Sequence, residues 1–317
     1  MISGQAEDDP NGLQVSFGFF RGWWAYGLSS EPREVWLAVP NNGELIGCYL
    51  LELPQRENNT AAFLELGISL DRRRRGLGTA LLAHSLERAE LAGRTIVESV
   101  CRAGSPGNAF ATAKDARPGV RDVRSVLEVG PKLLAILPGL RAEATARASG
   151  YSLRYWTGPA PDDLVAQNAA IEGAMADAPH EDWFEPATWD TARIRLGEQR
   201  LSAQGVRRYS IAAMHDATGE MAALTQLIVD PAAGGWAFQE MTAVVRPHRG
   251  HRLGILVKVA MLAQLIELEP LVRQVMTFNA VDNEPMLAVN ERLGYQVNDY
   301  FQHYQFDVRH QHSRARA

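Results

Sequence analysis

The feature that most constrains the fold of this 317-residue chain is an internal repeat. Landmark residues recur 176 positions apart without a gap, among them Gly43 and Gly219, Arg73 and Arg249. Each half therefore specifies the same supersecondary unit. Two packed copies account for a chain that is longer than one hydrophobic core usually fills.

The local patterns of the two halves also agree. In the first half, β-prone runs and helical patterns alternate in the order 35–39, 45–53, 61–70, the helix 77–92, and 95–100. In the second half the corresponding segments are 209–215, 221–229, 236–245, a helix from 253, 273–279, and a helix at 283–293. This order predicts a β-β-β-α-β-α unit that occurs twice.

The repeat also predicts the domain organisation. We expect a partly degenerate N-terminal domain at 1–116, a connecting segment at 117–149 with a helix at 140–149, and a C-terminal domain at 150–317. Asp162 is a plausible N-cap for a helix through residue 176. The polar tail from residue 309 is expected to fray.

Charge and cysteine content exclude several function classes. The 32 Lys and Arg against 37 Asp and Glu give a net charge of -5, so no basic field favours nucleic acid. Only Cys48 and Cys101 are present, without disulfide or metal-ligand spacing, which favours the cytoplasm. No apolar run is long enough for a membrane span, so no membrane partner is expected, and the oligomeric state stays open.

The chemically informative element is a strand that runs through a cationic, glycine-containing loop into a helix. It occurs at 68–78 and again at 244–254. A helix start offers unpaired N–H groups and the positive end of its dipole, and glycine permits close approach, so such a loop suits a pyrophosphate. The alternative is an ordinary capped helix with solvated arginines. A P-loop and a GxGxxG fingerprint are both absent.

These loops resemble the signature [R/Q]-x-x-G-x-[G/A] of the GCN5-related N-acetyltransferases, the GNAT superfamily. Residues 73–78 match it fully, and 249–254 match except at Arg252, where the family usually has Gly. We expect a side chain to be tolerated there if the local φ is negative. Residues 283–295 are similar to the family's later segment N-x-x-A-x-x-L-Y-x-K-x-G-F, with Asn290 in place of the Tyr that protonates the leaving thiolate. In the first half only 109–116 corresponds, with Asp115 in place of Gly.

The resemblance implies an α/β (α+β) fold of two tandem GNAT domains, each a mixed, mostly antiparallel, splayed sheet flanked by helices. The whole chain is similar to tandem acetyltransferases of the kind that includes mycothiol synthase. The resemblance implies acetyl-CoA (CoA) as cofactor, a small-molecule primary amine as acceptor, and direct attack of that amine on the thioester. The implied cofactor-binding residues are Ile68, Ser69, Leu70, Arg73, Arg74, Arg75, Gly76, Leu77, Gly78, Val244, Val245, Arg246, Arg249, Gly250, His251, Arg252, Leu253, Gly254, Asn279 and Asn283.

Direct transfer needs a neutral amine, so a carboxylate or a water chain must take a proton. Glu240 is the candidate general base; the competing interpretation is a solvent-facing or edge residue without a catalytic role. Glu65 is its weaker counterpart, displaced by one position, which would reverse its facing. His248 and His251 flank an arginine but have no further ligand at metal spacing, so no metal is expected.

Two interpretations stay open for one further residue and for one further segment. Lys258 is either a phosphate contact or a surface lysine, and the acidic, aromatic stretch 177–190 is either an acceptor wall or a solvated loop. The leading function is an N-acetyltransferase with catalysis mainly in the second domain. The alternatives are a non-catalytic acyl-CoA-binding or sensor protein and a thiol-cofactor biosynthetic acetyltransferase.

Overall fold

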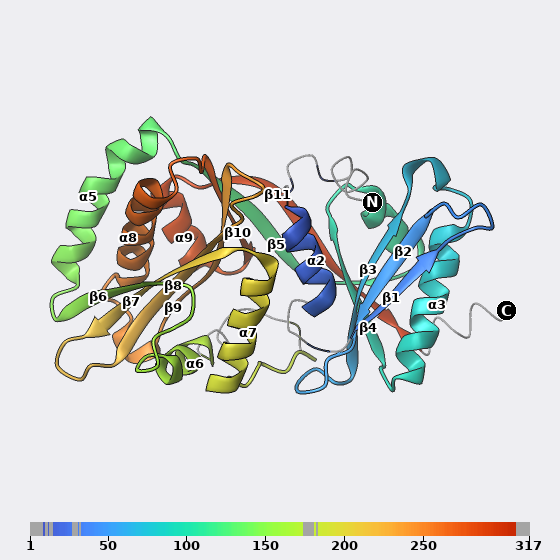
Figure 1. Cartoon of the computed structure of the whole chain (residues 1–317), viewed down its shortest axis with the longest axis horizontal. Coiled ribbons are helices and arrows are strands. Elements are labelled where there is room, and N and C mark those ends of the chain that lie inside the picture. Colours follow the sequence, from blue (N-terminus) through green and yellow to red (C-terminus); the bar gives the residue numbers. More distant parts are fainter. Residues whose placement is uncertain are drawn as a thin grey trace.

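One continuous sheet organises the whole molecule (Figure 1). The computed structural model describes residues 9, 12, 15–26, 31, 33–173, 181 and 183–308. The eleven strands lie in the order β1-β2-β3-β4-β11-β5-β10-β9-β8-β7-β6. They are β1 Arg33–Ala38, β2 Gly47–Glu52, β3 Ala61–Ile68, β4 Ile96–Arg102, β5 Arg117–Glu128, β6 Tyr151–Thr157, β7 Arg207–His215, β8 Met221–Val229, β9 Trp236–Val244, β10 Gln274–Ala280 and β11 Gln296–Asp307.

Helices cover both faces of this sheet. They are α2 Phe17–Tyr26, α3 Leu77–Leu91, α4 Pro106–Ala113, α5 Pro131–Arg147, α6 Val165–Gly173, α7 Thr191–Gln204, α8 Leu253–Leu268 and α9 Glu284–Leu293. In the second half, α5 and α8 pack on one face and α6 on the other, each over its own hydrophobic cluster. In the first half, α3 and α4 cover a third cluster. Among the described helices, none has the length and apolarity that crossing a membrane requires.

The two halves exchange their last strands. Strand β11 of the second half pairs antiparallel with β4 of the first half, from Phe301 opposite Arg102 to Asp307 opposite Ile96. In return, β5 of the first half pairs with β10 of the second. At the centre of the sheet β5 and β11 pair with each other. Each half therefore supplies the strand that completes the sheet of the other.

Buried charges hold this exchange together. Arg124 of β5 is 1% exposed and forms ion pairs with Asp299 of β11 and with Asp9. Removing one partner of a buried ion pair leaves an uncompensated charge, so the seam depends on both strands being in place.

His303 of β11 sits between carboxylates of the first half. Its Nδ1 lies 2.9 Å from Glu98 of β4, and its Nε2 lies 3.0 Å from Asp122 of β5. Burial lowers the pKa of His303, but the hydrogen bonds to Asp122 and Glu98 outweigh it and raise the pKa to about 9. The imidazolium is therefore the form that joins the exchanged strand to its neighbours at neutral pH.

This histidine predicts a pH dependence of stability. The pKa of His303 is higher in the folded state than in the unfolded state. Its contribution to the free energy of unfolding is therefore complete below about pH 6.5 and is lost as the pH rises through about 9. We expect the free energy of unfolding of the wild type to exceed that of His303→Gln by about 2 kcal/mol at pH 6, and the difference to shrink by pH 9.5. Urea unfolding of both proteins at the two pH values measures it. A difference in the free energy of unfolding that stays constant or grows with pH would contradict a stabilising role of the charged histidine between the exchanged strands.

Most predicted elements are confirmed, and the departures concern the segment 117–149 and Asp162. The segment 117–149, expected to connect the copies, contains β5 and a helix that begins at Pro131 rather than at residue 140. This helix continues through Pro138, because Leu133 and Leu137 are buried in the core that α8 shares. Asp162 is not an N-cap, since α6 begins at Val165. The expected fraying from residue 309 lies outside the described residues.

Candidate active site

Each half contains a pair of parallel strands that separate. Strands β3 and β4 are paired only from Ala61 opposite Ile96 to Phe63 opposite Glu98. Strands β9 and β10 are paired only from Gln274 opposite Trp236 to Met276 opposite Phe238. Beyond these points the facing backbone N–H and C=O groups have no ladder partner across the gap, so an extended ligand can hydrogen-bond to them.

The cationic loops follow these diverging strands. Each begins with a short 3-10 helix, Leu70–Arg72 in the first half and Arg246–His248 in the second. The signature arginines make the same contact in both copies: Arg73 Nε donates to the carbonyl of Ile68 at 3.1 Å, and Arg249 Nε donates to that of Val244 at 3.2 Å. These two arginines therefore fasten each loop to the end of its strand.

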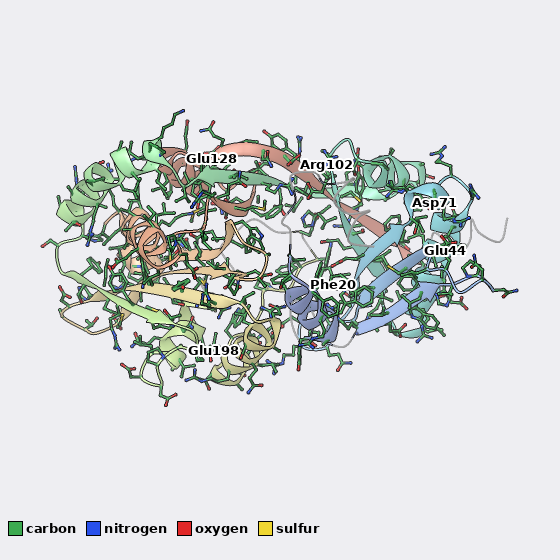
Figure 2. All side chains as sticks on the ribbon, turned by 45° about the horizontal axis from the view of Figure 1, so that its top comes forward. Phe20, Glu44, Asp71, Arg102, Glu128 and Glu198 are labelled. Carbon is green, nitrogen blue, oxygen red and sulfur yellow. The ribbon has the colours of Figure 1, made fainter. Side chains whose placement is uncertain are left out.

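One arginine of the first loop, Arg72, forms ion pairs within the protein. The Arg72 guanidinium lies 2.6 Å from Glu44 and 3.1 Å from Asp71, and both carboxylates are at the same end of the molecule (Figure 2). The charge of Arg72 is thus matched within the protein, and this arginine is not needed to explain anion binding by the loop.

Both loops contain two left-handed residues at equivalent positions. In the first loop they are Arg74, with φ of 61°, and Gly76, with φ of 85°; in the second they are Gly250, at 89°, and Arg252, at 57°. Arginine and glycine have exchanged places, while the backbone path is kept. The condition stated for Arg252, a negative φ, is therefore not met, and its side chain is accommodated in a left-handed conformation. A loop with such residues before a helix N-terminus presents converging N–H groups, which fit a pyrophosphate.

Arg252 bears a conformational cost, because a left-handed backbone disfavours residues with a Cβ. Its guanidinium forms an ion pair with Glu143 of α5, which also lies 2.6 Å from Arg292. Arg252→Gly and Arg252→Ala both lose this pair and differ only at the Cβ. We expect the Gly variant to be more stable than the Ala variant by about 1 kcal/mol in urea unfolding. Equal stabilities would contradict the left-handed conformation.

The other predicted cofactor residues of the second half lie on α9 and β10. Asn283 is the N-cap of α9, and its side chain accepts the N–H of Met286 at 3.4 Å. Asn279 lies on β10 beyond the last residue that pairs with β9. The corresponding part of the first half is shorter: Asp115, with φ of 53°, takes the left-handed position that Gly294 takes after α9.

Lys258 is neither a surface lysine nor placed to contact phosphate directly. It is 1% exposed in the middle of α8, and its Nζ donates to Asn290 Oδ1 at 2.6 Å. Asn290 Nδ2 in turn donates to Asn279 Oδ1 at 2.8 Å. Burial lowers the pKa of Lys258 to about 7. A signal was present in the sequence, since the residues on either side of Lys258, 255–257 and 259–263, are all apolar, which is typical of a buried helical segment.

Glu240, the predicted general base, lies at a β-bulge. The register of β9 against β8 shifts between Gln239 and Met241, so Glu240 is the extra residue. Its carboxylate is partly buried and accepts hydrogen bonds from Arg208 at 2.8 and 3.4 Å. The carboxylate of the predicted base is therefore engaged in an ion pair with Arg208.

Glu65 of β3 has a different environment. Its side chain is reached by solvent but is crowded by surrounding protein, and this desolvation raises its pKa to about 7. Arg33 acts in the opposite direction and Glu52 in the same direction as burial. A carboxyl group whose pKa is near neutrality is well suited to take a proton at pH 7.

The two carboxylates share one face of the sheet. The expectation that the one-residue displacement reverses the facing of Glu65 is wrong, because the bulge in β9 adds one residue and β3 has none. Paired or contacting side chains connect the two positions across this face: Phe238, Phe278, Phe301, His303, Glu98 and Phe63. Both candidate bases therefore face the same side of the central strands.

The remaining candidates have structural partners. His248 Nδ1 lies 2.8 Å from the Tyr151 hydroxyl, and the His251 ring packs on the same tyrosine. Within the described ranges, no group of three or more His, Cys, Asp or Glu is arranged to hold a metal ion. In the stretch 177–190, Trp183 packs on Phe63, next to Glu65, whereas Asp177 and Asp182 lie outside the described residues.

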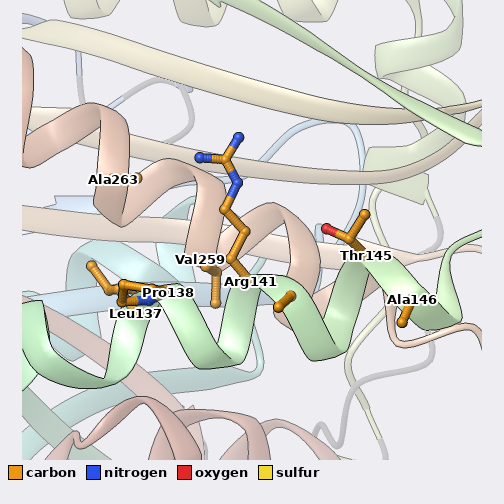
Figure 3. Close-up of a pocket in the computed structure, with 8 residues that line it drawn as sticks. Leu137, Pro138, Arg141, Thr145, Ala146, Val259 and Ala263 are labelled. Carbon is orange, nitrogen blue, oxygen red and sulfur yellow. The ribbon is translucent and has the colours of Figure 1, made fainter.

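A cavity of about 670 Å³ lies between α5 and α8 (Figure 3). Its lining comes from Leu137 to Ala146 of α5 and from Val259 and Ala263 of α8. It lies outside the sheet and includes neither a diverging strand nor a glycine loop. We therefore place the candidate active sites at the diverging strands and not in this cavity.

Comparisons with known proteins support the fold. Residues 5–109 match the model of the Acetyltransferase (GNAT) family. A tandem GNAT protein from the clavulanic acid biosynthesis pathway superposes with a TM-score of 0.82 and 29% identity, covering 97% of this chain and 92% of that one. A GCN5-related N-acetyltransferase from Sphaerobacter thermophilus shares the fold at a TM-score of 0.66 and 16% identity, covering 97% and 90%. No curated protein matches the chain.

Proposed function

Because the chain is a tandem protein of the GNAT superfamily, we propose that it transfers an acetyl group from acetyl-CoA to a primary amine of a small-molecule acceptor. The GNAT fold supports acyl transfer from acetyl-CoA in general. The observation that carries the proposal is the strand pair that diverges directly before an arginine- and glycine-containing helix start, present in both halves.

The chain's own residues fit this donor. The loops at 73–78 and 249–254 would hold the pyrophosphate through backbone N–H groups, and the diverging strands would bind the pantetheine arm. Acetyl-CoA supplies the acetyl group as an activated thioester. The acceptor nitrogen forms the new N–C bond as the C–S bond breaks, and a carboxylate takes the proton that the amine loses. Glu240 in the second site and Glu65 in the first are the proposed bases.

One observation supports a small acceptor, and a second supports a cytoplasmic location of the protein. The tandem relative at 29% identity belongs to a biosynthetic pathway for a small molecule, which favours a small acceptor here. The two cysteines are both free thiols, which favours a reducing compartment such as the cytoplasm.

Glutamine substitutions test the bases. We expect Glu240→Gln or Glu65→Gln to lower turnover by about 100-fold or more while leaving the affinity for acetyl-CoA unchanged, because the proton acceptor is lost and the cofactor loops are not altered. Where Glu65 is the working base, the wild-type rate rises as the pH increases through about 7, since only the carboxylate accepts a proton. Release of the CoA thiol with a panel of small amines measures turnover.

The exposed surface residue Glu128, replaced by Gln, is the matched control and is expected to keep full turnover. Unchanged turnover in both glutamate variants would remove these residues from the mechanism. Acetyl-CoA binding without thiol release for any amine would favour the non-catalytic acyl-CoA-binding function instead.

A further inference from the structure

The second half contains a buried polar chain that the proposed transfer has not yet used. It runs from Lys258 on α8 through Asn290 on α9 to Asn279 on β10. Lys258 and Asn290 are 1% and 2% exposed, whereas Asn279 is only partly buried. The chain therefore leads from the core to the strand that diverges from β9.

Donor and acceptor rules fix the direction of every amide in this chain. In its protonated form the Lys258 nitrogen can only donate, so Asn290 turns its Oδ1 towards Lys258. The Nδ2 of Asn290 is then left for Asn279, which must accept with its Oδ1. As a result, the Nδ2 group of Asn279 is directed away from this chain as a donor. No carboxylate forms an ion pair with Lys258 among the described residues, and its Nζ lies 5.0 Å from the centroid of the Tyr295 ring.

The position of Asn279 indicates what this donor meets. It lies three residues beyond Met276, the last residue of β10 that pairs with β9, which is about 10 Å along an extended strand. The proposed pantetheine arm follows this strand between the thioester and the pyrophosphate, and its amide carbonyls are hydrogen-bond acceptors.

We propose that Lys258 is a positioning residue of the second site, which fixes the Asn290 and Asn279 amides so that Asn279 presents an N–H donor to an amide carbonyl of the pantetheine arm. This inference rests on the proposed function. The first half has no equivalent, because Leu82 and Ala111 stand where the second half has Lys258 and Asn290. The hydrogen-bonded series Lys258, Asn290 and Asn279 is therefore a feature of the second site that the first site lacks.

The decisive variant is Asn290→Asp, which is almost isosteric. Its carboxylate still accepts from Lys258 but cannot donate, so Asn279 must turn its Nδ2 inwards and present an oxygen to the cofactor. Lys258 keeps a buried hydrogen-bond acceptor, whereas Asn279 presents an acceptor to the cofactor in place of a donor. Lys258→Met is the second variant: it frees Asn290 to adopt either orientation and is expected to have a smaller effect.

The measurement is calorimetric binding in the Gly78→Glu background, which leaves only the second loop able to bind. We expect Asn290→Asp to weaken CoA and acetyl-CoA by about 10-fold and Lys258→Met by about threefold. Adenosine 3′,5′-bisphosphate, which lacks the arm, is the matched probe, and its affinity should not change.

Two results would overturn the inference. One is an Asn290→Asp protein, or a Lys258→Met protein if the former does not fold, that binds CoA as its parent does. The other is a Gly78→Glu parent that binds no CoA although the wild type does. Failure of the wild type itself to bind CoA would instead overturn the proposed function, so the two failures are distinguishable.

Discussion

Replacing Gly78 or Gly254 with Glu should weaken acetyl-CoA binding by at least 100-fold at the loop that holds the cofactor. Each glycine is the second residue of its helix, α3 or α8, where backbone N–H groups have no partner within the helix. A carboxylate there would occupy the anion position and repel the pyrophosphate, a loss of about 3 kcal/mol.

The folded protein tolerates these changes, which makes the result interpretable. A Cβ at Gly78 would lie 3.4 Å from the Phe110 ring, and one at Gly254 would lie 3.6 Å from Val244. Gln at the same positions has the same size without the charge and is the matched control, with a smaller expected loss. Titration of each variant with acetyl-CoA shows which loop works. Wild-type affinity together with wild-type stoichiometry in both Glu variants would rule out the loops as cofactor sites.

The second large effect concerns folding. The fragments 1–149 and 150–317 should each fail to fold alone, although each contains one full repeat. In the first fragment β4 lacks β11, and in the second β10 lacks β5, so each exposes an unpaired strand edge. The buried Arg124 would also lose Asp299. We expect little native circular dichroism from either fragment and recovery of the native signal when both are mixed.

The same exchange predicts that the whole chain unfolds in one transition, because neither half is complete without the other. Urea unfolding followed by circular dichroism and by tryptophan fluorescence should give coincident curves. Two separated transitions, or a fragment with a native spectrum of its own, would contradict the reciprocal exchange of β5 and β11.

The local elements could be predicted from the sequence because their causes are local. Strand β8 has the predicted bounds, and α3 and α8 begin at the predicted residues, Leu77 and Leu253. The strand, loop and helix at each site also lie where the 176-residue repeat puts them. Strand exchange could not be predicted, because β11 has the same pattern whether it pairs with β4 or with a strand of its own half.

The site shows the same division. The repeat located both loops, but the backbone conformation of Arg252 required the structure, because a left-handed arginine has no distinct local pattern. The facing of Glu65 depended on a bulge in the other copy, which is a property of strand pairing. The buried Lys258 was accessible to sequence reasoning, since the residues on either side of it, 255–257 and 259–263, are all apolar.

Calorimetric titration of the wild-type protein with acetyl-CoA tests the central claim most directly. If the diverging strands and their loops form a GNAT cofactor site, acetyl-CoA binds, and Gly78→Glu or Gly254→Glu removes the binding at the loop that it alters. If the wild type binds neither acetyl-CoA nor CoA, the acetyltransferase function is contradicted, although the GNAT fold remains.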